Sequence, residues 1–129
     1  MRILLLNNNE ERRLADSFQL KSRGHKTVDL CCGHEARSCA KEDFDAAIIE
    51  ISGKVGFPVV MFLARYIKQI LVIADPCDEG PQTSETSLII DSTFKINDSW
   101  VKIIREPLTP AGERDWGKIL SCLKILSSY

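Results

Sequence analysis

The residues with chemical potential lie where two short apolar segments end. Asn7 and Asn8 follow the apolar segment 2–6, and Glu50 comes near the end of the segment 45–51. If these segments are neighbouring strands of a parallel sheet, their carboxyl ends meet at the edge where such sheets bind ligands. Two carboxamides and one long carboxylate carry little charge. We therefore predict a surface that binds partners and does not accept phosphate.

The cysteines form a second candidate group. The chain has 5, an odd number, at positions 31, 32, 39, 77 and 122, and none forms a C-x-x-C pair. This pattern does not suit a secreted disulfide framework, so we expect reduced thiols. Cys31, Cys32, His34 and Cys39 lie close enough in sequence to raise the question of a metal, but their spacing is not that of structural zinc. We expect Cys31 in a strand core and Cys39 in a helix core.

Motifs for other chemistry are weak or missing. The segment 29–33, Asp-Leu-Cys-Cys-Gly, resembles the first motif of some S-adenosylmethionine methyltransferases but lacks the further glycines that close backbone approach needs. Neither a glycine-rich nucleotide-binding motif nor a G-x-S-x-G turn occurs in the sequence. We therefore predict no enzymatic activity and no catalytic residues.

The elements that must position these residues alternate between strand and helix. Short aliphatic runs bounded by turn residues predict parallel strands, at 2–6, 26–30, 45–51, 69–74 and 100–105. Helical spacing predicts helices at 10–23, 56–68 and 111–126. In the first helix we expect the stripe with Leu14 and Phe18 to face the sheet. The segment 81–98 is rich in β-branched residues, and a helix, a strand and a loop all remain open there.

In order and spacing the chain resembles a response-regulator receiver domain over nearly its whole length. The phrases that carry the resemblance are Ile-Leu-Leu-Leu-Asn-Asn-Asn at 3–9, Arg-Gly-His-Lys-Thr-Val at 23–28, Phe-Asp-Ala-Ala-Ile-Ile-Glu at 44–50 and Arg-Glu-Pro at 105–107. The resemblance implies a single flavodoxin-like α/β domain over 1–129. It would be a three-layer sandwich with a five-stranded parallel sheet in the order 2-1-3-4-5.

The chain departs from that family at the metal and acceptor positions. The resemblance implies two acidic residues for Mg²⁺ after the first strand, where this chain has Asn7 and Asn8. Asn brings no charge, so we expect weak or absent Mg²⁺ binding and no other cofactor. The family's phosphoacceptor Asp is Glu50 here, and its extra methylene would misplace the carboxylate. Helix capping by the asparagines and a solvated strand-end role for Glu50 are the ordinary alternatives.

Two further family positions also differ. The Ser or Thr that reads the phosphoryl group corresponds to Ala74, or to Asp75 in a shifted register, and neither has a hydroxyl. The family's Lys corresponds to Glu106, followed by Pro107, for which the resemblance raises the expectation of a cis peptide. A phosphoryl group on Glu50 would then face a like charge, and we expect no cation to offset it. Together these positions predict a degenerate phosphorylation pocket.

The resemblance also indicates where such a domain contacts proteins. The corresponding interface would be drawn from Ile90, Phe94, Trp100, Lys102 and Trp116. Aromatic residues beside charges suit an interface. We expect an atypical receiver-like signalling domain that acts by phosphorylation-independent protein–protein interaction, with a histidine kinase, an output domain or a second copy as the kinds of partner.

Two alternatives remain open at this point. One is a working receiver domain that uses a nonstandard acceptor such as Asp45, Asp75 or Glu50. The other is a flavodoxin-like domain that binds a small molecule or cofactor, since a fold does not fix a function.

Composition excludes other classes of partner. The 129 residues carry 17 basic and 18 acidic side chains, a net charge of -1, so no strong field favours nucleic acid or a membrane surface. No apolar run reaches the roughly 18 residues of a membrane span, and the N-terminus lacks the pattern of a signal peptide. We expect a cytoplasmic protein.

Overall fold

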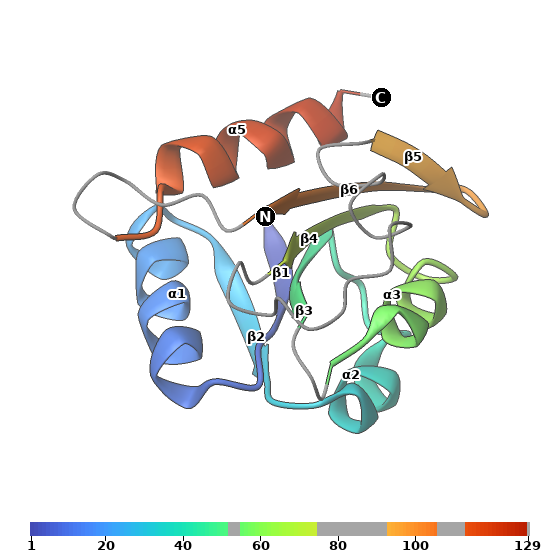
Figure 1. The fold of residues 1–129 in the computed structure, drawn as a ribbon, viewed down its shortest axis with the longest axis horizontal. Coiled ribbons are helices and arrows are strands. Elements are labelled where there is room, and N and C mark those ends of the chain that lie inside the picture. The colour runs from blue at the N-terminus through green and yellow to red at the C-terminus, as the bar shows by residue number, and fades with distance from the viewer. Residues whose placement is uncertain (52–54, 75–92, 106–112, 129) are drawn as a thin grey trace.

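A computed structural model of the chain describes residues 1–51, 55–74, 93–105 and 113–128. A six-stranded sheet in the order β2-β1-β3-β4-β6-β5 runs through the centre, with α1 and α5 on one face and α2 and α3 on the other (Figure 1). The first five strands in that order are parallel. The predicted α/β sandwich and its order 2-1-3-4-5 are thus confirmed, with β6 as the fifth parallel strand and β5 added at the edge.

The bounds of the strands and of the first helix agree closely with the sequence pattern, whereas the helix predicted at 111–126 begins only at residue 116. The strands are β1 (Arg2–Leu6), β2 (Lys26–Leu30), β3 (Ala46–Ile51), β4 (Gln69–Ala74), β5 (Thr93–Ile96) and β6 (Ser99–Arg105). The helices are α1 (Glu10–Ser22), α2 (Gly33–Cys39), α3 (Phe57–Leu63) and α5 (Trp116–Ser127).

The core has two halves because both faces of the sheet are covered. Alternate residues of each strand point to opposite faces. Leu4, Leu6 and Ile49 pack with α2 and α3, whereas Leu5 and Ile48 pack with α1 and α5. Continuous apolar runs are expected for strands that are buried on both faces.

Helix α1 is rotated relative to our prediction. Asp16, Ser17 and Leu20 are its buried residues, whereas Leu14 is 60% exposed and Phe18 is 69% exposed. The expectation that Leu14 and Phe18 face the sheet was wrong. The apolar periodicity of the sequence indicated the wrong face, because the buried face of this helix includes polar side chains with partners inside the fold.

Helix α3 ends earlier than predicted because the chain turns sharply into β4. The buried Ser99 hydroxyl oxygen lies 2.5 Å from the carbonyl oxygen of Ala64 and 2.7 Å from that of Ile67, so its single O–H proton is donated to one of them or shared between the two. At Ala64, the C-cap of α3, the hydroxyl meets an acceptor that the end of a helix leaves without a partner. A single serine on β6 thus fixes the end of α3.

The ambiguous segment is partly a strand. Residues 93–96 form β5, which pairs antiparallel with β6 through a turn at Asn97, whose φ is 55°. Asn tolerates this left-handed conformation better than most residues. The rest of that segment, 81–92, lies outside the described residues. Among the described helices, none is long and apolar enough to cross a membrane.

Candidate functional site

The ends of β1 and β3 lie side by side, as the sequence predicted. Leu6 of β1 is the register partner of Ile49 of β3, so Asn7 and Glu50 come one residue later on adjacent strands. Both side chains are buried, with exposed fractions of 1% for Asn7 and 4% for Glu50. Strand alternation directs Glu50 to the face that α1 and α5 cover, together with Ile48.

The three asparagines shape the turn into α1. The Oδ1 atom of Asn7 accepts from the backbone N–H of Asn9 at 2.9 Å, and Oδ1 of Asn9 caps α1 by accepting from the N–H of Arg12 at 3.0 Å. The exposed Asn8 donates to the carbonyl of Cys31 at 3.2 Å. Among the described residues, Nδ2 of Asn7 is a buried donor with no hydrogen-bond acceptor. The capping role is therefore confirmed for Asn9.

Glu50 is the acceptor for two guanidinium groups. Its Oε1 atom lies 2.6 Å from Nη2 of Arg114 and 3.3 Å from Nη1 of Arg12. The Nε atom of Arg114 also lies 3.2 Å from Oδ1 of Asp16 on α1. The side chains of Glu50, Arg114 and Asp16 are 5%, 8% and 6% exposed. We call these three residues the buried ion-pair network.

The network corrects two expectations from the sequence. Glu50 is not a solvated strand-end residue, because its carboxylate is buried and paired. Cations also lie beside it, whereas we expected none. Arg114 comes from the segment just before α5 and is 64 residues from Glu50 in sequence. Neither periodicity nor a local motif could have paired them, and the periodicity of α1 placed Asp16 on the face that was expected to be exposed.

The other predicted pocket residues are only partly described. Ala74 is the last residue of β4, half-buried, and pairs in register with Ile51 and Arg105. Glu106, Pro107 and Asp75 lie outside the described residues.

Asp45, the alternative acceptor, lies at the amino end of β3, where its Oδ2 accepts from the backbone N–H of Arg2 at 2.7 Å. Asp45 therefore lies at the amino ends of the strands, whereas Glu50 lies at their carboxyl ends.

The predicted interface residues do not share one face of the sheet. Phe94 packs with the α2 and α3 side of the core, whereas Trp100 and Trp116 pack with the α1 and α5 side. Lys102 is half-buried on β6, and Ile90 lies outside the described residues. Whether any of these residues contacts a protein partner stays a prediction.

Of the two cysteines predicted in the core, Cys31 lies differently from the prediction. Cys31 is half-buried just beyond the end of β2 and not within the strand, whereas Cys39, half-buried at the end of α2, packs against the core on the α2 and α3 side as expected. A hydrogen bond to the Glu35 carboxylate, helped by burial, raises the pKa of Cys31 to about 11. Burial, with Glu42 and Glu35 nearby, raises the pKa of Cys39. Protonated thiols of this kind react slowly with electrophiles and oxidants.

Solved structures resemble this chain over nearly its full length. A response regulator receiver protein from Sinorhizobium medicae WSM419 superposes with a TM-score of 0.69 at 15% identity, covering 99% of this chain and 94% of that one. What the two chains share is the arrangement of the sheet and the helices. The chain has the receiver-domain fold. A CheY-like receiver domain from Methanospirillum hungatei JF-1 gives a TM-score of 0.64 at 18% identity, covering 98% and 96% of the two chains.

The chemotaxis protein CheY4 of Vibrio cholerae is similar to the same degree, with a TM-score of 0.64, 16% identity and 97% coverage of both chains. No protein-family model matches the sequence of this chain, and no curated protein matches it. At these identities the likeness establishes the receiver-domain fold, and function must be argued from the site.

Replacing Arg114 tests the buried ion-pair network. Arg114→Ala should lower the free energy of unfolding by about 3–5 kcal/mol, because it leaves two buried carboxylates without their shared guanidinium. Chemical denaturation measures the change. The matched control is Glu42→Gln, which removes the exposed pair between Arg2 and Glu42. That change should cost less than about 1 kcal/mol. Equal effects of the two variants would contradict the network.

Proposed function

We propose that this protein is a receiver-like signalling module that acts through protein–protein interaction and without phosphorylation. The observation that carries the proposal is the pairing of Glu50 with Arg114 and Arg12. At the strand end where the fold's acceptor Asp would lie, the carboxylate is already the partner of the chain's own cations.

The pairing makes Glu50 a poor nucleophile. A phosphodonor must reach a carboxylate oxygen, but Glu50 is only 4% exposed, and its Oε1 accepts from two guanidinium groups. An attack from that oxygen would break charge-assisted hydrogen bonds, which are among the stronger polar interactions in proteins. The surroundings of Glu50 therefore favour a structural role.

The donor set around Glu50 does not fit Mg²⁺, which the receiver fold would imply. This ion needs a near-octahedral shell of oxygens with carboxylates among them. Asn7 uses its oxygen on the turn into α1, Asn8 points its amide nitrogen at the carbonyl of Cys31, and Glu50 is held by arginines. The positive charges of Arg12 and Arg114 balance the negative charges of Asp16 and Glu50. These four side chains therefore have no net charge to attract a cation. We assign no step to a metal here.

The network also ties elements that a switch would have to move. Arg114 joins the end of β3, through Glu50, to α1, through Asp16, and it lies directly before the Asp115 cap of α5. A ligand can shift a conformational equilibrium only by its differential affinity for the two states. With the phosphoryl input removed, partner binding is the remaining source of such a difference.

An exposed apolar pair on α1 supplies a surface for a partner. Leu14 and Phe18 are one helical turn apart, and both are more exposed than buried. Aromatic residues, Phe among them, are enriched in the cores of protein–protein interfaces relative to the rest of the surface. A histidine kinase, an output domain and a second copy of the chain are the kinds of protein that we propose for this surface.

The absence of phosphorylation is tested by intact mass. After incubation with acetyl phosphate and Mg²⁺, the protein should keep its mass, whereas a phosphorylatable receiver domain in the same tube gains a phosphoryl group. Glu50→Gln is the matched variant. A phosphoryl gain in the wild type that disappears in Glu50→Gln would make Glu50 an acceptor and refute the proposal. A phosphoryl gain in both proteins would also refute the proposal, because the phosphoryl group would then be on another residue.

The role of the α1 surface is tested by Phe18→Ser. This change should leave the free energy of unfolding within about 0.5 kcal/mol because the side chain is exposed. It should weaken association, with the partner or with a second copy, by roughly tenfold or more, as expected for an aromatic anchor. Sedimentation measures association with a second copy, and affinity capture measures association with a partner protein. Met61→Ser is the control, because Met61 is 55% exposed on α3, across the sheet. Equal association of both variants with the wild type would contradict this surface.

A further inference from the structure

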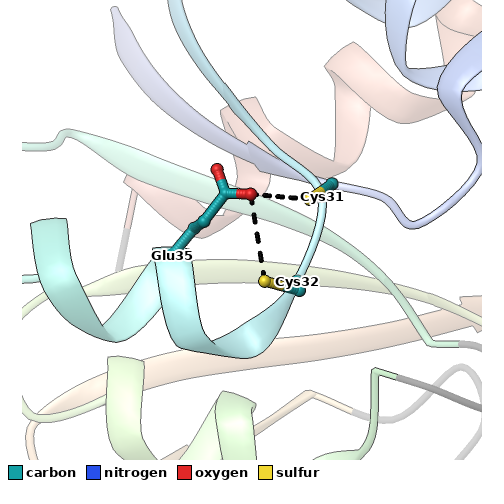
Figure 2. A group of neighbouring side chains, drawn as sticks. All are labelled: Cys31, Cys32 and Glu35. Carbon is teal, nitrogen blue, oxygen red and sulfur yellow. Dashed lines mark hydrogen bonds between the residues drawn. The ribbon is translucent and has the colours of Figure 1, made fainter.

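Two adjacent cysteines and a glutamate converge beside the pocket just described. Cys31 and Cys32 form the turn from β2 to α2, and Glu35 lies on the first turn of α2. The Oε1 atom of Glu35 lies 2.6 Å from Sγ of Cys31 and 3.9 Å from Sγ of Cys32. Figure 2 shows the carboxylate turned back toward both sulfurs, and all three ligand atoms lie within 4.8 Å of one another.

The backbone beneath these ligands is held from three directions. The carbonyl of Cys31 accepts from Nδ2 of Asn8 at 3.2 Å, and the carbonyl of Cys32 accepts from the N–H of Ala36 at 3.2 Å. At Gly33 a Cβ atom would come within 2.6 Å of Cγ2 of Val59. Only glycine permits this approach of the turn to α3. The two sulfurs are thus presented from a fixed turn, which lowers the cost of assembling a site.

The donor atoms select the class of ligand. Thiolates prefer soft or borderline cations, whereas Mg²⁺ and Ca²⁺ prefer oxygen. Zn²⁺ takes Cys sulfur at about 2.3 Å and carboxylate oxygen at about 2.0–2.2 Å. Around a tetrahedral ion of this kind two sulfurs lie about 3.8 Å apart, and a sulfur and a carboxylate oxygen about 3.6 Å apart. The Cys31 sulfur and the Glu35 oxygen, which lie 2.6 Å apart in their hydrogen bond, would have to separate by about 1 Å to admit a cation, whereas the 3.9 Å between the Cys32 sulfur and the same oxygen is close to the spacing that an ion needs. Both cysteines are half-buried, so solvent can supply a further ligand.

We propose that Cys31, Cys32 and Glu35 form a binding site for a thiophilic divalent cation of the Zn²⁺ type, with one coordination position left to solvent. The position of Glu35 favours a cation over a disulfide between the two cysteines. A disulfide has no S–H to donate, so it would leave the carboxylate facing two sulfurs without a favourable contact. The site uses none of the residues of the buried ion-pair network, so it does not depend on the proposed function.

Cadmium titration of the reduced protein tests the site, because thiolate–cadmium bonds absorb in the near ultraviolet. We would use a background of Cys39→Ser, Cys77→Ser and Cys122→Ala, in which Cys31 and Cys32 are the only thiols. One Cd²⁺ should bind per chain, and Zn²⁺ should displace it. Cys31→Ser or Cys32→Ser in the same background should weaken binding by at least about 100-fold, and Glu35→Gln by at least about tenfold.

The controls separate the site from trivial outcomes. Restoring Cys39 should not change the affinity, since its Sγ donates to the backbone carbonyl of Glu35 at 3.0 Å and is turned to the helix. Circular dichroism checks that each variant folds. Absence of a saturable signal overturns the proposal, as does an affinity that survives the loss of Cys32. A disulfide between Cys31 and Cys32 would show as a loss of two hydrogens in air. If that disulfide forms readily and the reduced protein binds no Cd²⁺, the proposal is also overturned.

Discussion

A carboxylate buried at the end of a strand needs polar partners inside the fold, and at Glu50 two guanidinium groups supply them. Arg114 contacts Glu50 and also Asp16, so one guanidinium joins β3, α1 and the approach to α5. Such a network costs desolvation on every member, and hydrogen bonds of good geometry must offset it. It fixes the mutual position of three elements more surely than it adds stability.

The network also explains why part of the structure could be predicted and part could not. Continuous apolar runs such as residues 70–74 of β4 specify buried parallel strands, and the order of βα units left few topologies to consider. The face of α1 was predicted wrongly because Asp16 and Ser17 are buried by specific partners, Arg114 and Thr27, which periodicity does not register. The resemblance located the site at Asn7 and Glu50, whereas its cation comes from a distant, irregular segment.

Two loops at the same edge of the sheet now have different assignments. The asparagine turn after β1 is a structural element that starts α1, and the cysteine turn after β2 presents a cluster of metal-ligating atoms. Asn8 joins them through its hydrogen bond to Cys31. The edge where this fold is expected to bind its ligand is therefore occupied by internal polar contacts in one half and carries a proposed cation site in the other.

The central claim is that the Glu50 pocket no longer responds to Mg²⁺ and a phosphoryl group, and one measurement tests it most directly. Amide chemical shifts would be followed during a Mg²⁺ titration with and without beryllofluoride, a mimic of the phosphoryl group. We predict no saturable change at Asn7, Glu50, Ala74 or Arg114. A saturable change at these residues that requires beryllofluoride would show a working pocket and would contradict the account.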